Sequence, residues 1–230
     1  MKMPVHEHGY VQLLATYGDE GTIVKAARTS YNKGLKGPEE DKKLIHYLYK
    51  NRHTSPFEQC SISYEIFLPI FVMRQLVRHR TFRLNEFSAR YSEMPDKFYM
   101  PKYWRVQDTV NKQSSIVERD TTIDHGACSG MVDNAHKVAF GTYQKLISCG
   151  VAREVARIVL PVSIYTKIHI NCDLNNLMKF FTLRLDSHAQ LEMRDYAHAM
   201  LLVFSSYFPT VYDCWERYKF ICQDTCIDTI

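Results

Sequence analysis

Glycine-rich nucleotide-binding loops are missing from this sequence. None of its nine glycines falls in a G-x-G-x-x-G, G-x-x-x-x-G-K-[ST] or G-x-S-x-G pattern. The chain therefore carries no signal of a dinucleotide-binding fold, a P-loop or a hydrolase nucleophile elbow. A nucleotide or nucleotide-like cofactor would need a site of another kind.

Cys-x-x-Cys pairs are also missing. The seven cysteines stand at 60, 128, 149, 172, 214, 222 and 226, and an odd number without such pairs argues against a disulfide framework and a zinc ribbon. Cys222 and Cys226 lie four apart, but no histidine spacing nearby completes a zinc ligand set. We expect reduced thiols, mostly in the core, and no metal site.

Long hydrophobic runs are absent as well. No stretch approaches the ~18 apolar residues of a membrane-spanning helix, and the first ten residues, MKMPVHEHGY, lack the apolar region of a secretion signal. We therefore expect a cytoplasmic protein with no membrane partner. A hydrophobic share of 46% with 23% charged residues is typical of a globular protein. Without a repeat or a break in composition, residues 1–230 are interpreted as a single domain.

Positive charge, in contrast, is concentrated in one window. From Arg74 to Arg90 there are five arginines and one acid, Glu86, and this excess of four equals the net charge of +4 of the whole chain. A localised cluster favours a small phosphorylated ligand over a broad nucleic-acid face, so we expect no nucleic-acid partner. One alternative is a structural subunit with salt bridges between chains. The main alternative is a nucleic-acid-binding module that would contact phosphates through Arg78, Arg80, Arg83 and Arg90.

A predicted strand and a predicted helix precede the basic triplet of this window. Residues 60–66 alternate with period two, which predicts a strand whose one face carries Ile62, Tyr64 and Ile66. A helix is expected to begin near Pro69 and to end in Arg78-His79-Arg80. Cations at a helix C-terminus stabilise the helix dipole by roughly 0.3–1 kcal/mol each, so the triplet alone has a structural explanation.

The segment after the triplet strengthens the case for a site. Glu86, Ser88, Arg90 and Ser92 alternate with Phe87, Ala89 and Tyr91, which predicts a strand with one wholly polar face. On an exposed edge such a face is merely solvated. Directly after a basic helix end, however, it can aim a carboxylate, a hydroxyl and a guanidinium at one point, and convergent charged groups are typical of a binding site.

The remaining chain is mainly helical around one irregular stretch. Residues 94–123 are polar and irregular, which indicates a surface excursion of the kind that often covers a site. Pro38 followed by three acids indicates the first turn of a helix, and Asp173 is a plausible cap for another. Further helices are expected over residues 132–148, 152–160, 174–183 and 189–207, and the second of these would place Arg153 and Arg157 on one face.

Arg184 stands out because it follows the apolar run 177–183. A buried, unpaired guanidinium costs several kcal/mol unless an anion or an acceptor meets it, so something negative should face Arg184. For Glu192 and Arg194, which follow shortly after, capping and salt bridges between helices are the preferred interpretation. The stretch His53 to Glu58 fits a capped turn and a plain helix start equally well.

Together these segments resemble one family. Arg78-His-Arg80, then seven residues, then Ser88-Ala-Arg90-Tyr-Ser92 closely resembles the signature of flavin-dependent thymidylate synthases. The resemblance extends over most of residues 30–218, through the segments His53-Thr-Ser-Pro-Phe-Glu58, Arg153-Glu-Val-Ala-Arg157-Ile-Val-Leu-Pro161 and Leu183-Arg-Leu-Asp-Ser-His-Ala-Gln190 with Glu192.

The resemblance implies a fold, a reaction and an assembly. The expected fold is α/β (α+β), with an antiparallel sheet packed by helices. In the implied reaction NADPH reduces bound FAD, methylenetetrahydrofolate donates one carbon, and C5 of dUMP is methylated to give dTMP, with no nucleophile from the protein. The implied assembly is a homotetramer whose sites combine residues of several subunits.

The resemblance also implies roles for individual residues. The cofactor FAD should be held by Ser55, Glu58, Arg78, His79, Arg80, Glu86, Asp173, Asn175 and Lys179. The substrate dUMP should be held by Gln75, Arg78, Glu86, Phe87, Ser88, Ala89, Arg90, Arg157 and Arg184. Arg184 is the implied catalytic residue, because a fixed guanidinium at the uracil edge favours negative charge on N3 and its neighbouring oxygen and so directs electron density to C5.

Three positions depart from the family pattern. Arg83 stands where serine is common, Asp173-Leu-Asn175 replaces Asn-x-Arg, and Lys179 replaces a flavin-contacting asparagine. We hypothesise that Arg83 and Lys179 add positive charge at the FAD phosphates. The absorbance of the purified protein separates the enzyme from both alternatives, because bound oxidised flavin is yellow.

Overall fold

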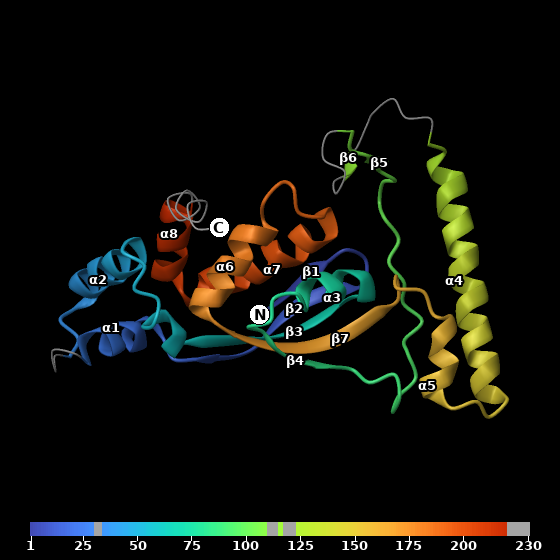
Figure 1. The fold of residues 1–230 in the computed structure, drawn as a ribbon, viewed down its shortest axis with the longest axis horizontal. Coiled ribbons are helices and arrows are strands. Elements are labelled where there is room, and N and C mark those ends of the chain that lie inside the picture. The colour runs from blue at the N-terminus through green and yellow to red at the C-terminus, as the bar shows by residue number, and fades with distance from the viewer. Residues whose placement is uncertain (30–33, 110–114, 117–122, 220–230) are drawn as a thin grey trace, which may run out of the picture.

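The computed structural model describes residues 1–29, 34–109, 115–116 and 123–219. Its main sheet has five antiparallel strands in the order β1-β2-β3-β7-β4 (Figure 1). These strands are β1 Lys2–Val5, β2 Gly9–Tyr17, β3 Ser61–Pro69, β7 Tyr165–Asp173 and β4 Arg83–Glu86. A separate two-stranded ladder pairs β5 Val106–Gln107 with β6 Ser115–Ile116. The expected antiparallel α+β architecture is confirmed.

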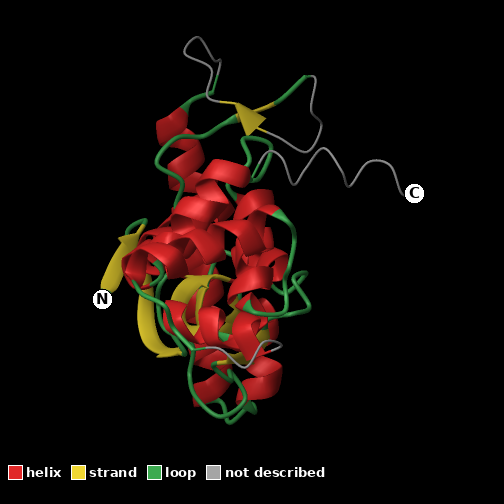
Figure 2. Ribbon diagram, turned by 90° about the vertical axis from the view of Figure 1, so that its left-hand side faces the viewer, coloured by secondary structure: helices red, strands yellow, loops and turns green. Residues whose placement is uncertain are grey.

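Helices α6 and α7 cover one face of this sheet (Figure 1), and Figure 2 shows helices packed against the strands. The helices are α1 Glu20–Arg28, α2 Pro38–Lys50, α3 Ile70–Leu76, α4 His125–Ser148, α5 Arg153–Ala156, α6 Leu174–Arg184, α7 Leu191–Tyr207 and α8 Pro209–Tyr218. None of the helices in the described ranges is long and apolar enough to cross a bilayer.

The covered face of the sheet is the apolar face predicted for β3. Ile62, Tyr64 and Ile66 are fully buried, and Ile168 of the neighbouring strand joins them in the main core. Burying one such aliphatic side chain stabilises the fold by roughly 1.5–3 kcal/mol. The alternate positions, such as Glu65, lie on the uncovered face and are only partly buried. Strand alternation therefore fixes which face packs against the helices.

Capping residues decide where several helices begin. The Asp173 carboxylate accepts a hydrogen bond from the Asn176 backbone N–H at 2.9 Å, so the predicted cap of α6 is confirmed. As predicted, α2 begins at Pro38 and α7 ends at Tyr207. The helix expected from residue 132 begins earlier, at His125, because Asp124 caps it by accepting from the Ala127 N–H at 2.9 Å.

The predicted strand over residues 86–92 is wrong beyond its start. β4 ends at Glu86, and the backbone N–H groups of Tyr91 and Ser92 both bond to the Ser88 carbonyl oxygen at 3.1 Å. The Ser88 hydroxyl also accepts from the Arg90 N–H at 3.3 Å. A serine side chain that bonds nearby backbone favours a turn over a strand. Ser88 and Arg90 therefore lie in one turn, not on one strand face.

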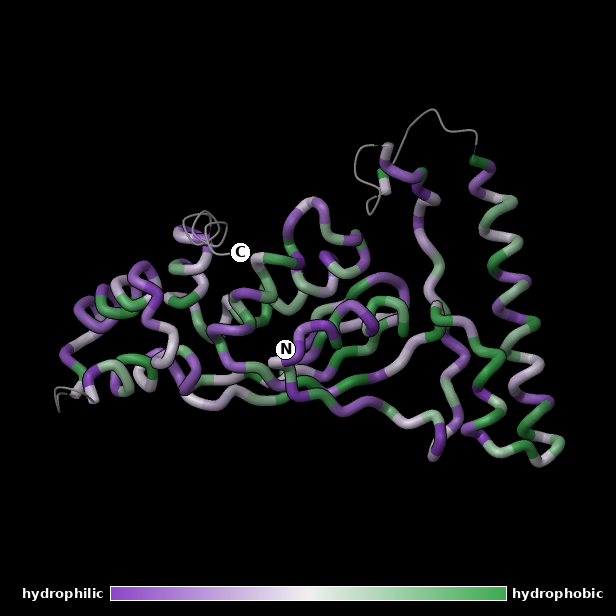
Figure 3. Tube along the Cα trace, in the orientation of Figure 1, coloured by the Kyte–Doolittle hydropathy of each residue, from purple (hydrophilic) through white to green (hydrophobic). Residues whose placement is uncertain are grey.

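A second, smaller core lies apart from the sheet. It contains Ala89 and Met94 from the chain after β4, Tyr143 from α4, Ala156 from α5, and Ile164. The Tyr143 hydroxyl accepts a hydrogen bond from the Met94 N–H at 3.1 Å. Figure 3 shows apolar and polar positions mixed along α4, as expected of a helix that packs on one side. We call α4 and α5 with this small core the arm.

The described cysteines are free thiols, as expected. Cys60, Cys172 and Cys214 are buried, whereas Cys128 is partly exposed and Cys149 is exposed. Cys222 and Cys226 lie outside the described residues, as does most of the end of the excursion, residues 110–114 and 117–122.

Candidate active site

The Arg184 side chain contacts the His79 side chain and the Gln75 backbone where α3 and α6 end, and we call Gln75, His79 and Arg184 the Arg184 cluster. Arg184 Nε donates to His79 Nε2 at 2.8 Å, and Arg184 Nη2 donates to the Gln75 carbonyl oxygen at 3.4 Å. The His79 ring stands edge-on to Phe180, with ring centroids 4.9 Å apart. The predicted projection of the basic triplet from a helix end is confirmed, since α3 ends at Leu76.

The electrostatics of this cluster favour a neutral histidine beside a charged arginine. Burial, together with the neighbouring Arg184 guanidinium, lowers the pKa of His79 to about 4. Neutral His79 can therefore accept the Arg184 N–H near pH 7. Burial also lowers the pKa of Arg184, although a guanidinium stays protonated in proteins. Among the described residues no carboxylate pairs with Arg184, so the negative group expected to face it is not supplied there.

A chain of hydrogen bonds leads from this cluster to a buried acid. Gln75 Nε2 donates to Gln190 Oε1, and Gln190 Nε2 donates to Glu192 Oε2 at 2.8 Å. Glu192 is only 1% exposed, and its Oε1 accepts from Tyr99 Oη and Arg105 Nη2, both at 2.7 Å. Burial alone would raise the pKa of Glu192, but these hydrogen bonds outweigh it and hold the pKa below its usual value.

This chain of hydrogen bonds was only partly predictable from the sequence. Glu192 does form a salt bridge, but its partner Arg105 belongs to the irregular excursion and not to a neighbouring helix. For Arg194 the expected salt bridge is wrong within the described residues, where its Nε is buried without a partner. Sequence reasoning missed Tyr99 and Arg105, and no local pattern marks them, since they lie about ninety residues before Glu192.

A second group, which we call the Arg90 cluster, contains Ser88, Arg90, Glu154 and Arg157. Arg90 Nε lies 3.0 Å from Glu154 Oε2, and Arg157 Nε donates to the Glu154 carbonyl oxygen at 3.3 Å. Both arginines are exposed, and exposed ion pairs contribute only about 0–1 kcal/mol. A doubly charged anion can therefore displace Glu154 from Arg90 at little cost. Arg90 and Arg157 therefore both contact Glu154, while their binding of a ligand stays a prediction.

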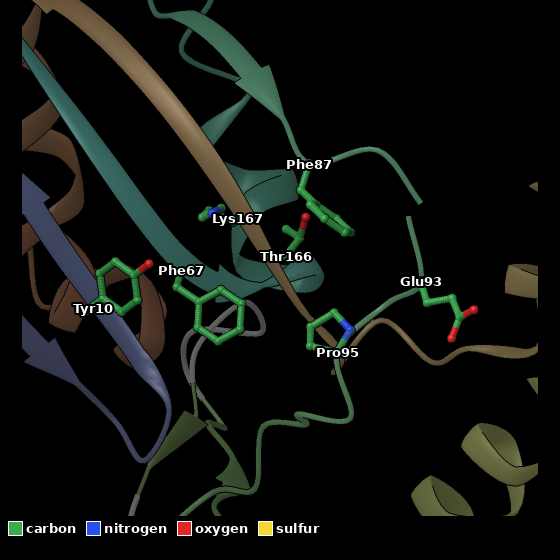
Figure 4. A pocket seen from close by; sticks show the side chains of 7 residues that line it. All are labelled: Tyr10, Phe67, Phe87, Glu93, Pro95, Thr166 and Lys167. Atoms are coloured by element: carbon green, nitrogen blue, oxygen red, sulfur yellow. The ribbon is translucent and has the colours of Figure 1, made fainter. Parts of the chain in front are cut away.

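Glu86, the last residue of β4, and Phe87 lie just before that turn. Glu86 Oε1 accepts from Thr166 Oγ1 at 2.9 Å. A hollow of about 340 Å³ opens beside them, and Figure 4 shows Phe87 and Thr166 next to each other at its edge. Its other lining residues are Tyr10, Phe67, Glu93, Pro95 and Lys167. The hollow is mostly apolar and has one acid, Glu93, at its margin.

A larger pocket of about 540 Å³ lies between α2 and α6, and we call it the α2–α6 pocket. It is lined by Leu48, Tyr49, Arg52, His53, Thr54, Phe57, Asn175, Met178, Lys179, Thr182 and Leu183. Asn175 Nδ2 donates to Glu58 Oε1 at 3.0 Å, so the stretch after His53 is tied to α6. That stretch forms a short 3-10 turn, Phe57–Gln59. Ser55 is exposed beside it.

This pocket fits the chemistry of a flavin nucleotide. Its apolar walls can take a planar ring, and exposed Lys179 adds a cation suited to a phosphate. Asp173 sits at the start of α6 with its carboxylate engaged by Asn176, so it acts there as a helix cap. Arg83 lies elsewhere: its Nη1 donates to Asn171 Oδ1 at 2.9 Å, on the uncovered face of the sheet.

The basic triplet itself is open to solvent. Arg78 and Arg80 are exposed, and within the described ranges neither forms an ion pair or a side-chain hydrogen bond. Unpaired guanidinium groups next to the Arg184 cluster suit the recognition of phosphate or another anion. They leave the alternative of nucleic-acid phosphates open on geometry alone.

The Arg90 cluster stays apart from the Arg184 cluster in one copy of the chain. Figure 1 shows α5, which carries Glu154 of the Arg90 cluster, at one end of the molecule with α4, whereas α6 lies over the sheet. Within the described residues no hydrogen bond or ion pair joins Arg90 or Arg157 to Arg184. A single chain therefore presents two arginine groups and a pocket, but not one closed site.

Comparisons with known proteins all point to one family. A model of the family described as "Thymidylate synthase complementing protein" matches residues 12–210. The chain is 43% identical over 220 residues to a flavin-dependent thymidylate synthase of Kosmotoga olearia, covering 96% of this chain and 95% of the relative. It is 41% identical to a flavin-dependent thymidylate synthase of Thermus thermophilus, covering 95% of this chain and 79% of the relative.

A solved structure agrees with these relatives. The crystal structure of a UMP/dUMP methylase, PolB from Streptomyces cacaoi, bound with 5-Br dUMP, superposes with a TM-score of 0.82 at 33% sequence identity. The match covers 94% of this chain and 97% of that one.

Proposed function

This chain belongs to the thymidylate synthase complementing protein family, and from that premise we propose that it is a flavin-dependent thymidylate synthase. It methylates C5 of dUMP to give dTMP, with methylenetetrahydrofolate as the carbon donor and NADPH as the reductant, through bound FAD. The structural observation that carries the proposal is the Arg184 guanidinium, which is partly buried and, among the described residues, is met only by the neutral acceptors His79 Nε2 and the Gln75 backbone oxygen.

Arg184 is the catalytic residue in this proposal. His79 and the Gln75 carbonyl hold Nε and Nη2, which leaves the other N–H groups of the guanidinium for the uracil edge. A cation fixed there before the substrate arrives stabilises negative charge on N3 and its neighbouring oxygen, and electron density moves to C5. Because neutral His79 accepts an N–H and adds no charge, it orients Arg184 without opposing its effect.

The Arg90 cluster is proposed to hold the phosphate of dUMP. Arg90 and Arg157 offer two planar guanidinium forks that match phosphate oxygens, and the phosphate replaces the exposed Glu154 carboxylate that now meets Arg90. Ser88 adds a hydroxyl at the start of the turn. Ser88 binds the ligand and does not attack it, since the reaction needs no bond between protein and uracil.

FAD is proposed to lie along the α2–α6 pocket and the basic triplet. The residues that would hold it are Ser55, Glu58, Arg78, His79, Arg80, Glu86, Asp173, Asn175 and Lys179. FAD, when bound, takes up hydride from NADPH and supplies reducing equivalents to the transferred carbon. Lys179 contributes charge for the diphosphate, and Asn175, held by Glu58, contributes an amide.

The separation of the clusters is explained if copies of the chain assemble. We propose a homotetramer in which the Arg90 cluster of one subunit closes the Arg184 cluster of another. Apolar side chains on the arm support this, because Val155 and Ile158 are 50% and 75% exposed beside Arg157. Exposed apolar patches of this kind mark protein interfaces.

Tritium release tests the reaction directly. Replacement of hydrogen at C5 frees tritium from dUMP labelled at C5, and we expect this release to require both NADPH and methylenetetrahydrofolate. We also expect the purified protein to be yellow. A colourless protein that releases no tritium and binds DNA or RNA in a strongly salt-dependent manner would instead favour the nucleic-acid module.

Mixing two inactive variants tests the shared site. Arg157→Ala and Arg184→Ala each damage a different half of the site, so subunits exchanged between them should form some sites with both halves intact. We expect the mixture to regain activity that neither variant has alone. Mixtures that exchange subunits, as followed by size-exclusion chromatography with mass spectrometry, yet stay inactive would refute the shared site.

A further inference from the structure

We propose that Glu192 fixes the direction in which the side-chain amide of Gln75 faces the nucleotide, so that Gln75 offers its oxygen to dUMP and not its nitrogen. Glu192 and Gln190 are then positioning residues, since neither is placed against the ligand. The proposal rests on the proposed function, because it assigns a specificity device to the dUMP site.

The direction originates at a group that can only accept hydrogen bonds. An ionised carboxylate has no hydrogen to donate. Glu192 is almost fully buried, and its three partners, Tyr99, Arg105 and Gln190, all approach it with donors at 2.7–2.8 Å. The Arg105 guanidinium keeps the charge of Glu192 balanced. Gln190 must therefore turn its NH₂ group toward Glu192.

The direction passes along the two amides. With its NH₂ group bonded to Glu192, Gln190 has only its oxygen left on the other side, and this oxygen accepts from Gln75 Nε2. One N–H of the Gln75 NH₂ group is then bonded to Gln190, which turns the Gln75 amide oxygen away from Gln190. No described residue donates to Gln75 Oε1, so this oxygen is the acceptor that the amide offers to a ligand.

Gln75 is well placed to act on the same ligand as Arg184. The Gln75 backbone carbonyl oxygen accepts from Arg184 Nη2 at 3.4 Å, so the Arg184 guanidinium reaches the end of α3, where the Gln75 side chain begins. An acceptor beside a guanidinium completes a pattern of donor and acceptor that only a matching edge satisfies. The nucleotide must then bring a hydrogen-bond donor to Gln75 Oε1.

Two groups of dUMP can supply that donor: the N3–H of uracil and the 3′-hydroxyl of the sugar. Both satisfy the same requirement, and analogues separate them. 3-Methyl-dUMP lacks the first donor, and 2′,3′-dideoxy-UMP lacks the second. An acceptor left without its donor in a partly buried site weakens binding.

Replacing the Glu192 carboxylate by an amide should reverse the direction of the hydrogen bonds that run from position 192 to Gln75. In Glu192→Gln the single remaining oxygen stays with Arg105 and Tyr99, so the new NH₂ group points at Gln190. Gln190 and then Gln75 must rotate, and Gln75 now presents NH₂ to a donor. Adding Gln190→Glu restores an acceptor at position 190, which takes hydrogen bonds from both neighbours and returns Gln75 to its first orientation.

Calorimetry of dUMP binding to the FAD-loaded protein tests this without relying on turnover. We expect roughly a tenfold loss of affinity in Glu192→Gln and recovery to within about threefold of wild type in the double variant Gln190→Glu/Glu192→Gln. Glu65→Gln is the matched control, because Glu65 likewise accepts from a tyrosine and a second side chain, Tyr10 and His169. It should leave dUMP affinity within about twofold.

Three results would overturn the proposal: unchanged affinity in Glu192→Gln, a double variant as weak as the single one, or an equal loss in Glu65→Gln. If Glu192→Gln fails to fold, Gln190→Met still tests the idea, because it frees the Gln75 amide to rotate. The wild-type preference for dUMP over the analogue that lacks the recognised donor should then shrink at least threefold, and an unchanged preference refutes the relay. A wild-type protein that binds no dUMP refutes the proposed function instead.

Discussion

Protonation of His79 should destabilise the native protein below neutral pH. In the unfolded chain a histidine takes up its proton near pH 6.5, but native His79, beside Arg184, stays neutral down to about pH 4. Between these values the unfolded state binds more protons than the native state. The free energy of unfolding must therefore decrease as the pH falls from 6.5 to 4, with the full contribution of His79 lost at the lower end.

The size of this effect follows from the two pKa values. A tenfold change in proton affinity is worth about 1.4 kcal/mol, so the difference between pKa values of 6.5 and about 4 corresponds to at most about 3.5 kcal/mol. His79 is partly exposed, and solvent screens part of its repulsion with Arg184. We therefore expect His79 to account for about 1–2 kcal/mol of the stability lost between pH 7 and pH 4.

Urea unfolding at fixed protein and FAD concentrations measures this contribution of His79 to the free energy of unfolding. Acidic groups also titrate in this range, so the quantity of interest is the difference between wild type and His79→Gln, which keeps an acceptor for Arg184 but cannot titrate. Between pH 7 and pH 4 the free energy of unfolding should fall by about 1–2 kcal/mol less in the variant than in the wild type. Substituting the exposed His198 in α7 with glutamine serves as the control. Identical pH dependence in wild type and His79→Gln would refute the assignment of a neutral His79 beside Arg184.

Other substitutions test the remaining roles. Arg184→Lys should lower kcat by roughly 10²–10³-fold while FAD stays bound, and near-normal turnover would remove Arg184 from its catalytic role. Ser88→Ala should keep measurable dTMP formation, whereas a Ser88–uracil adduct found by mass spectrometry in the wild type would overturn the non-covalent mechanism. Lys179→Asn should weaken FAD binding up to about fivefold by losing one partly screened charge, and unchanged FAD affinity rejects its role at the phosphates. Arg83→Ser should leave FAD affinity unchanged, because Arg83 does not line the α2–α6 pocket and bonds to Asn171 on the uncovered face of the sheet.

Local signals allowed much of the fold to be predicted from the sequence. The period-two pattern of Ile62, Tyr64 and Ile66 and the cap at Asp173 each act within a few residues, and both elements formed as expected. The segment from Glu86 to Ser92 shows the limit of such signals. Its alternation fits a strand, but Ser88 bonds to the backbone of its own neighbours and turns the chain.

The sequence suggested a set of site residues but not their arrangement. The family resemblance named Arg90, Arg157 and Arg184, and the structure shows that the first two contact Glu154 while the third contacts His79. The pairing of Arg105 with Glu192 is set by tertiary packing across 87 positions. No periodicity or capping pattern encodes a contact between residues so far apart in the sequence, so the pairing of Arg105 with Glu192 could not be predicted.

The small core of the arm ties ligand recognition to residues that no ligand meets. Ala89 is both a member of the turn proposed to bind dUMP and a neighbour of Tyr143 and Ala156 in that core. Truncating the buried side chains of the arm would loosen the turn and weaken its binding of a phosphate. Substitutions on the outer side of α4 are therefore tolerated, whereas its inner side is constrained. A helix remote from the chemistry thus influences the affinity of the enzyme for its nucleotide.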